Sequence, residues 1–146
     1  MVIQSSRGAI DREIGVALLR ISLGVMYLAH SVILKGLTFG LGGAAGFFES
    51  LGLPGWLAYV TFACETVGGI CLVLGVQARW VALMLLPVLL GAIIWVHGGN
   101  GWVFTSQGGG WEYPLYLVVA SIAQVLLGDG AFALNPSGPL FTRTAS

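Results

Sequence analysis

Four long runs of apolar residues, separated by short polar or glycine-rich stretches, dominate the hydropathy pattern of this chain. They cover residues 14–34, 56–75, 79–97 and 113–128. Each run approaches the roughly 20 residues that a helix needs to cross a bilayer, and none shows the period-two alternation of a membrane β-barrel. The pattern predicts an all-α membrane protein, an antiparallel bundle of four transmembrane helices in a single domain over residues 1–146.

The connections between the runs predict how the helices follow one another. Only residues 76–78 separate the second and third runs, which predicts a tight antiparallel hairpin. The first connection is longer and still apolar. We expect its segment GGAAGFFESL, residues 42–51, to form a short interfacial helix or to dip partly into the bundle, with Pro54 ending it. The third connection, residues 98–112, is rich in Gly and Trp and can fold back over the bundle mouth.

Composition supports a membrane protein and excludes one class of function. Hydrophobic residues make up 57% of the chain and charged residues 8%, against roughly 25% charged residues in soluble domains. The six basic and six acidic residues cancel, so there is no basic field to hold nucleic acid. The lipid bilayer is therefore the expected surrounding, and nucleic acid is not an expected partner.

The basic residues predict the orientation of the bundle. An even number of spans places both termini on one side, and that side holds Arg7, Arg12, Arg79 and Arg143. The other side holds Lys35 alone. Positive charge favours the cytoplasmic side of a membrane, so we expect both termini in the cytoplasm of a bacterial cell. The N-terminal run is interpreted as a retained first span because it lacks a clear cleavage site.

An acidic residue in the second run needs a partner, because an ionised carboxylate in hydrocarbon is costly. At about 1.5 Å per residue, Glu65 lies about 14 Å and Arg20 about 21 Å from the outer ends of their runs. We therefore expect Arg20 to neutralise Glu65, while Gly68 and Gly69 let a neighbouring helix approach closely. The alternative is that this pair only fixes the register of the helices.

Further polar residues gather near the outer end of the predicted bundle. Lys35, His30, His97 and Glu112 lie near the mouth, and Tyr27 shares a polar stripe of the first span. The alternatives are that the histidines are satisfied interfacial residues and that the glutamate is simply solvated. No HxxxH or ExxH spacing places two ligands on one helix face, so a metal site is not expected.

Several segments of the sequence resemble the DoxX family of small bacterial four-helix membrane proteins. They are RISLGVMYLAHSVILKG, GFFESLGLPGW, ETVGGICLVLGVQARWVAL, HGGNGW and GGGWEYPL, spread over roughly residues 17 to 135. The residues that carry the resemblance together are Arg20, His30, Glu65, Gly69, Gly75, Arg79, His97, Asn100, Gly101, Glu112, Tyr113 and Pro114.

The resemblance implies an inner-membrane protein described as an oxidoreductase. Founding members of the family are associated with a thiosulfate:quinone oxidoreductase, and other relatives work with partners in redox defence. This chain departs from the family pattern at three positions. Ser31 replaces the usual Gly after the histidine, Lys35 follows that histidine by five residues where four is common, and Asn135 replaces a frequent Asp.

These observations lead to one functional hypothesis, a membrane redox protein or subunit that binds a quinone or another small lipophilic molecule in the outer half of the bundle. We expect Glu65, His30 and Arg20 to carry the chemistry. The residues expected to contact the ligand are His97, Glu112, Tyr27, Asn100, Trp102 and Tyr113. The sequence shows no ligand set for haem, flavin or an iron–sulfur cluster, so electrons have to come from a substrate or a redox partner.

Two other classes of function stay open. One is a small proton-coupled transporter of lipophilic or cationic solutes, although the unequal distribution of basic residues disfavours it. The other is a non-catalytic scaffold that docks a partner protein or a second copy of the chain. The GxxxG spacings at Gly36 and Gly40 and at Gly42 and Gly46 lie in the first connection, where they carry little weight as a dimer motif.

Overall fold

The computed structural model describes residues 2–140, with side chains described from residue 7 onward. Within this part, regular secondary structure is helical apart from one isolated bridge between Val76 and Asn135. The helices in chain order are α1 (Val2–Leu28), the π-helix η1 (Ala29–Thr38), α2 (Gly40–Ser50), α3 (Trp56–Leu74), α4 (Ala78–Gly91), the π-helix η2 (Ala92–His97), the short 3-10 helix η3 (Gly98–Asn100) and α5 (Glu112–Leu127). The expected all-α class is confirmed.

Three continuous helices are long and apolar enough to cross a bilayer. They are Arg7–Thr38, Trp56–Leu74 and Ala78–Asn100. The fourth predicted span, residues 113–128, corresponds to α5, which is apolar but has only 16 residues and is about 24 Å long. This is shorter than the roughly 30 Å hydrocarbon core of a bilayer, so α5 completes the bundle as a shorter helix.

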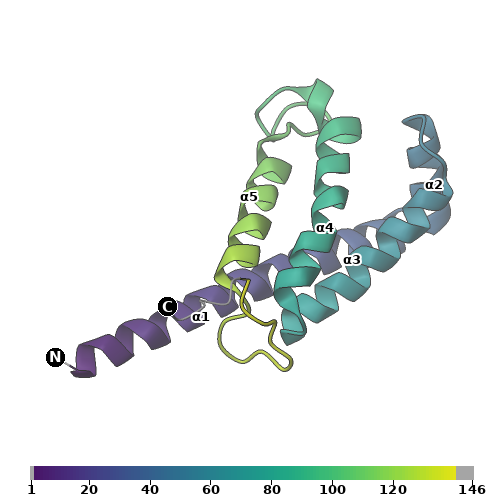
Figure 1. The fold of residues 1–146 in the computed structure, drawn as a ribbon. Helices are drawn as coiled ribbons and strands as arrows, with labels where there is room; N and C mark the ends of the chain where they lie inside the picture. Colours follow the sequence, from purple (N-terminus) through teal and green to yellow (C-terminus); the bar gives the residue numbers. More distant parts are fainter. Residues whose placement is uncertain (1, 141–146) are drawn as a thin grey trace.

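The helices form two pairs that converge at one end and diverge at the other (Figure 1). α1 packs along α3, and α4 packs along α5. We call the end that carries residues 98–111 the loop end, and the end that carries residues 128–137 the tail end. α2 lies at the loop end on the α1–α3 side, across a gap from α4 (Figure 1). The spreading of the two pairs creates the space in which the candidate site lies.

The tail end is closed by backbone hydrogen bonds between the C-terminal segment and the α3–α4 turn. α3 ends at Gly75, which adopts the left-handed conformation with φ of 70° that favours glycine. The Asn135 N–H donates to the Gly75 carbonyl at 3.0 Å, and the Gln77 N–H donates to the Asn135 carbonyl at 2.8 Å. The short turn between Leu74 and Ala78 confirms the predicted hairpin.

Glycines allow α3 to approach its neighbours closely, as the sequence predicted. A Cβ atom at Gly69 would lie 2.8 Å from Leu28 Cγ and 3.0 Å from the carbonyl oxygen of Gly24 on α1. A Cβ at Gly68 would lie 2.7 Å from Leu85 Cδ1 on α4. All three distances are shorter than ordinary van der Waals contact, so α3 approaches α1 and α4 at positions without side chains.

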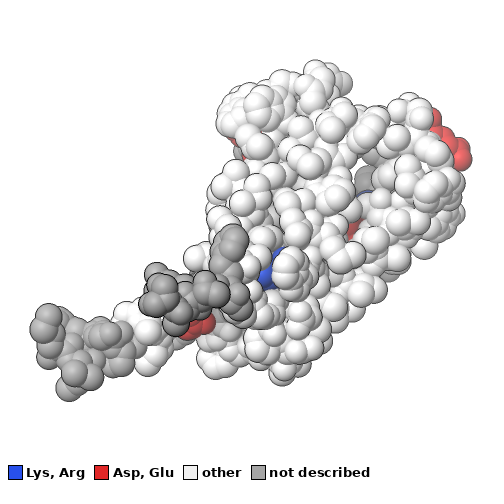
Figure 2. All heavy atoms as spheres, viewed as in Figure 1, with Lys and Arg blue, Asp and Glu red and all other residues white. Residues whose placement is uncertain are grey.

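The outward faces of the helices carry large apolar side chains. Leu37 and Met84 are both 78% exposed. The face shown in Figure 2 carries few charged atoms over the helical bundle. In water such a surface would be unfavourable, whereas acyl chains cover it without loss, which agrees with a membrane protein.

Candidate functional site

A large cavity lies between the two helix pairs at the loop end. Its volume is about 790 Å³. In Figure 2 the molecule is hollowed between α4 and α2, and charged atoms are visible inside the hollow. The polar or charged side chains in its lining are Tyr27, His30, Lys35, Thr61, Glu65, His97 and Tyr113. The remaining lining is almost entirely apolar, which is typical of a site for a small organic molecule.

Glu65 is paired with Lys35 in this cavity, and the expected pairing with Arg20 is wrong. Lys35 Nζ donates to Glu65 Oε2 at 2.5 Å, and the two side chains are 17% and 6% exposed. Arg20 instead donates from Nη2 to the Ala131 carbonyl at 3.1 Å. The buried carboxylate therefore has the charged partner that it needs. That partner is Lys35, which lies nearer the loop end of the first span than Arg20 does.

The direction of side chains along a helix explains this exchange of partners. A Cα–Cβ bond tilts toward the N-terminus of its helix. Glu65 therefore leans toward the loop end, where α3 begins, while Arg20 and Lys35 lean toward the tail end, where α1 begins. Lys35 and Glu65 thus approach one another, whereas Arg20 points away and reaches Gly75, whose Cβ would lie 1.9 Å from Arg20 Nη1.

Arg20 belongs to a polar cluster at the tail end, outside the cavity lining. Its side chain is 1% exposed, and Asp129 is close enough to interact with it electrostatically. Asp129 Oδ1 accepts from the Ala78 N–H at 2.7 Å, at the first residue of α4. Arg79 donates to the carbonyl of Val125 near the end of α5. These contacts hold helix ends together, so the structure places Arg20 with the tail and not with Glu65.

His30 lies on the cavity wall within the π-helix η1. Its Nδ1 lies 3.0 Å from the Met26 carbonyl, and because a carbonyl only accepts, Nδ1 carries the proton. In the neutral ring Nε2 is then left as an acceptor. The His30 ring also stacks on Tyr113, with centroids 6.4 Å apart and planes inclined by 25°. α5 therefore helps to orient this histidine.

The π-helix also accounts for the unusual spacing between His30 and Lys35. In a π-helix each turn is closed by a hydrogen bond between residues five apart, so side chains at that spacing follow one another along one face. Both residues line the cavity. The additional residue relative to the family pattern is thus accommodated by η1. π-helical segments occur frequently at functional sites.

The second histidine lies on the cavity wall at the start of the 98–111 loop. His97 Nδ1 lies 2.9 Å from the Gly109 carbonyl, so this nitrogen is also the protonated one. Asn100 Nδ2 donates to the same carbonyl at 3.0 Å, and to the carbonyls of Val96 and Gly108. Asn100 is therefore placed to hold the loop, while His97 faces both the loop and the cavity.

Two other residues expected at the ligand contact the 98–111 loop and are not in the cavity lining: Trp102 within the loop and Glu112 at the start of α5. Glu112 Oε1 accepts from the Phe104 N–H at 2.8 Å. Trp102 packs edge to face on Trp111, with ring centroids 4.5 Å apart, and is 51% exposed. These contacts make the loop compact because they connect its first residues to its end at the start of α5.

The two tyrosines expected at the ligand do line the cavity. Tyr27 is 5% exposed, and its hydroxyl has no hydrogen-bond partner among the described residues. The Tyr113 hydroxyl donates to Met26 Sδ at 2.7 Å. Tyr27, His30, Glu65, His97 and Tyr113 are therefore the predicted site residues that the structure brings together.

Sequence reasoning missed the contribution of α2 to the cavity. The predicted interfacial helix over residues 42–51 is present as Gly40–Ser50, and it forms one wall. Gly43, Ala44, Phe47 and Phe48 all line the space. The available signal was the apolar segment itself, but no spacing in it specified which side it would cover. Within residues 2–140 no group of His, Cys, Asp or Glu forms a potential metal site.

Comparison with known proteins agrees with these features. The DoxX family model matches residues 15–98, the part that contains Lys35, Glu65 and both histidines. A Bacillus subtilis (strain 168) protein named "Putative oxidoreductase CatD" is 34% identical over 124 residues, which is 85% of this chain and 87% of the relative. No solved structure gives a significant match.

Proposed function

This chain belongs to the DoxX family of membrane proteins, and on that basis we propose that it is a redox-associated protein of the bacterial inner membrane that binds a quinone or a similar lipophilic molecule. The observation that carries this proposal is the cavity of about 790 Å³ with the Lys35–Glu65 pair on its wall. Pockets for small organic ligands span roughly 300–1,000 Å³ and combine apolar walls with a few polar groups.

The proposed orientation places the tail end and both termini in the cytoplasm. Arg7, Arg12 and Arg79 belong to that end, and Lys35 lies toward the loop end. The fourth arginine of this argument, Arg143, lies outside the described residues. The excess of arginine at the tail end supports this orientation by the positive-inside rule. The cavity then lies in the outer half of the membrane.

The polar groups of the cavity suit a quinone ring. The Lys35 ammonium group has three donors, of which the bond to Glu65 uses one, so it can also donate to a quinone oxygen. His30 and His97 each use Nδ1 for a backbone carbonyl, which leaves Nε2 of each ring to exchange a proton with a ligand. The apolar walls would surround the ring and the chain attached to it.

In this proposal the protein binds the quinone and handles its protons, and a redox partner supplies the electrons. A quinone that is reduced takes up protons together with electrons. The Lys35 ammonium group carries protons at the cavity, and Glu65 and the histidines can pass a proton to the ligand once they have taken one up. The name of the Bacillus subtilis relative, an oxidoreductase, supports a redox role. The partner is expected to be another protein of the same redox reaction.

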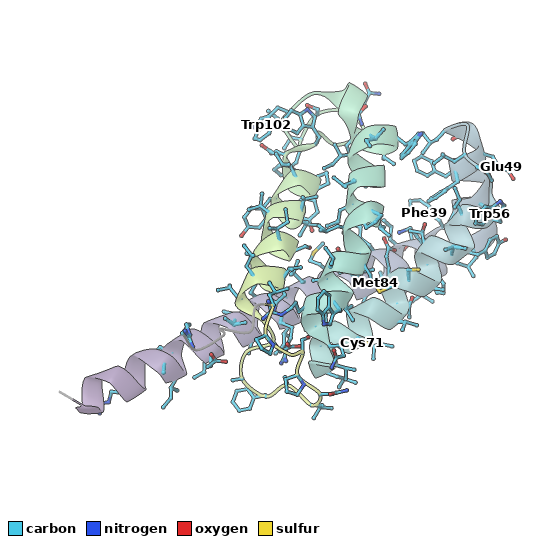
Figure 3. The ribbon with its side chains drawn as sticks, in the orientation of Figure 1. Phe39, Glu49, Trp56, Cys71, Met84 and Trp102 are labelled. Atoms are coloured by element: carbon cyan, nitrogen blue, oxygen red, sulfur yellow. The ribbon has the colours of Figure 1, made fainter. Side chains whose placement is uncertain are left out.

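The proposal is tested by titrating the purified protein in lipid nanodiscs with quinone analogues. We expect saturable binding to the wild type, and binding weaker by about tenfold or more in Glu65→Gln and His30→Ala, equivalent to about 1.4 kcal/mol. Glu49→Gln is the matched control, because Glu49 is an exposed acid on α2 outside the cavity lining, and Figure 3 shows it pointing away from the gap. This variant should bind like the wild type.

Two results would contradict the proposal. One is an absence of saturable binding to wild-type protein that is folded by circular dichroism. The other is equal affinity in the wild type and in both cavity variants, because the ligand would then bind elsewhere. If Glu49→Gln also binds more weakly than the wild type, the loss of affinity in Glu65→Gln would be due to the loss of an acidic charge in general and not to its place in the cavity.

A further inference from the structure

The mouth of the cavity can be located from side chains that both line it and are exposed. The aromatic residues with this property on the side of α2 and η2 are Phe39, Phe47 and Trp95, which are 62%, 48% and 48% exposed. They come from the η1–α2 junction, from α2 and from η2. Three aromatic rings from three places in the chain therefore border this opening, and we call them the aromatic rim.

The aromatic rim faces sideways, between helices, and not along the axis of the bundle. α2 packs on η1 and α3, while η2 continues α4 on the other side of the gap. Figure 3 shows Phe39 in the gap between α4 and α2, and Figure 2 shows the hollow at the same place. The 98–111 loop lies over the ends of α4 and α5 (Figure 1), so it leaves the side opening uncovered.

Apolar side chains that face outward flank the rim on both sides. Ile33 and Leu37 of η1 are 58% and 78% exposed, and Leu90 and Ile94 of the α4–η2 helix are 46% and 64% exposed. These residues belong to the two segments that are long and apolar enough to span a membrane. The opening therefore lies within the apolar band of the protein, where acyl chains and not water are adjacent.

We propose that the opening bounded by the aromatic rim is a lateral portal, through which an uncharged, ring-bearing lipophile dissolved in the bilayer enters the cavity. The identity of the ligand as a quinone-type ring rests on the proposed function, but the direction of entry does not. A lipophile that passes from acyl chains to aromatic side chains stays in an apolar environment. A water-soluble ion taking the same route would lose its hydration before reaching Lys35 and Glu65.

The first experiment establishes which solvent meets the rim, and it requires no ligand. A fluorophore is attached to Phe47→Cys or, as the control, to Glu49→Cys, in a background in which Cys64 and Cys71 are replaced by alanine. Both positions lie on α2 and are exposed, but one carries an apolar residue of the rim and the other a charged residue. Lipids brominated in the acyl chain and aqueous iodide serve as quenchers.

We expect the label at position 47 to be quenched several-fold more strongly by brominated lipid than the label at position 49. The reverse order is expected for iodide. If iodide reaches position 47 as readily as position 49, the opening faces water and the portal is excluded.

The second experiment closes the rim reversibly. Phe47→Cys and Trp95→Cys are combined in the same cysteine-free background and linked with a reducible bifunctional thiol reagent. We expect linking to slow the association of a quinone analogue by about tenfold or more, and reduction to restore it. Each single-cysteine variant treated with the same reagent is the control for labelling alone.

The outcomes separate the portal from the proposed function. Unchanged association after linking, in a protein that still loses affinity through Glu65→Gln, would overturn the portal and leave the proposed function intact. Absence of quinone binding to the unlinked wild type would overturn the proposed function, and the quenching experiment would then decide on the portal alone.

Discussion

The partner of Glu65 can be identified by measuring how strongly it is coupled to each of the two candidate cations. We consider two double-mutant cycles, one with Lys35→Met and Glu65→Gln and one with Arg20→Met and Glu65→Gln. The structure places Lys35 Nζ 2.5 Å from Glu65 Oε2, whereas Arg20 contacts the Ala131 carbonyl. Only the first cycle should show a large interaction energy.

The expected magnitude follows from the geometry of the pair. At 2.5 Å and an effective dielectric constant of about 20, two unit charges attract by about 6–7 kcal/mol before desolvation is subtracted. Removing one partner of a buried pair typically costs about 3–5 kcal/mol, because the other charge is left uncompensated. We therefore expect Lys35→Met alone to destabilise by about 3 kcal/mol, and Glu65→Gln in the same chain to recover most of that loss.

The assay is reversible unfolding of the purified protein in mixed micelles by increasing the fraction of denaturing detergent, followed by tryptophan fluorescence and circular dichroism. The Lys35–Glu65 pairing is refuted if its interaction energy is below about 0.5 kcal/mol, within the usual error of additivity. It is also refuted if the Arg20–Glu65 cycle gives the larger value, because the carboxylate would then be neutralised from the tail end.

Two further predictions concern the packing of the bundle and its loop. Gly24→Ala should destabilise the folded protein by about 1–3 kcal/mol, because the new Cβ would lie 2.8 Å from a backbone oxygen of α3. Gly15→Ala is the control in the same unfolding assay. Its Cβ would have no atom within 4 Å, so this variant should be neutral or slightly stabilising. Asn100→Ala should let a protease cleave the 98–111 loop several-fold faster, because three hydrogen bonds to backbone carbonyls are lost. An unchanged cleavage rate would show that other contacts hold the loop.

The hydrophobic pattern was sufficient for the helices because their burial in lipid depends on local composition. The run over residues 56–75 became α3 at Trp56–Leu74, and the short connection at 76–78 became the predicted hairpin. The length of α5 was the exception. Its run of residues 113–128 corresponds to a helix of 16 residues, shorter than the other three continuous helices.

The site was only partly predictable, because it depends on how side chains lean and on helices far apart in sequence. The sequence identified Glu65 as a residue that needs a partner, and depth alone made Arg20 a reasonable choice. Depth along a helix axis does not include the tilt of side chains toward the helix N-terminus, which favours Lys35 for a carboxylate on an antiparallel neighbour. Asn100, Trp102 and Glu112 were expected at a ligand. Asn100 and Glu112 instead bond to the backbone of the 98–111 loop, and Trp102 packs on Trp111.

The amino-acid sequence was enough to establish the helical class, the membrane environment, the family resemblance and the need to neutralise one buried acid. The helical class, the membrane environment and the unpaired acid follow from composition and from hydropathy within single segments, and the resemblance follows from short motifs spread along the chain. Three features became visible in the folded chain alone: Lys35 pairs with that acid, α2 forms a wall, and the two helix pairs separate at the loop end to enclose a cavity. These features depend on how the helices lie relative to one another, and that arrangement is set by contacts between residues far apart in the sequence.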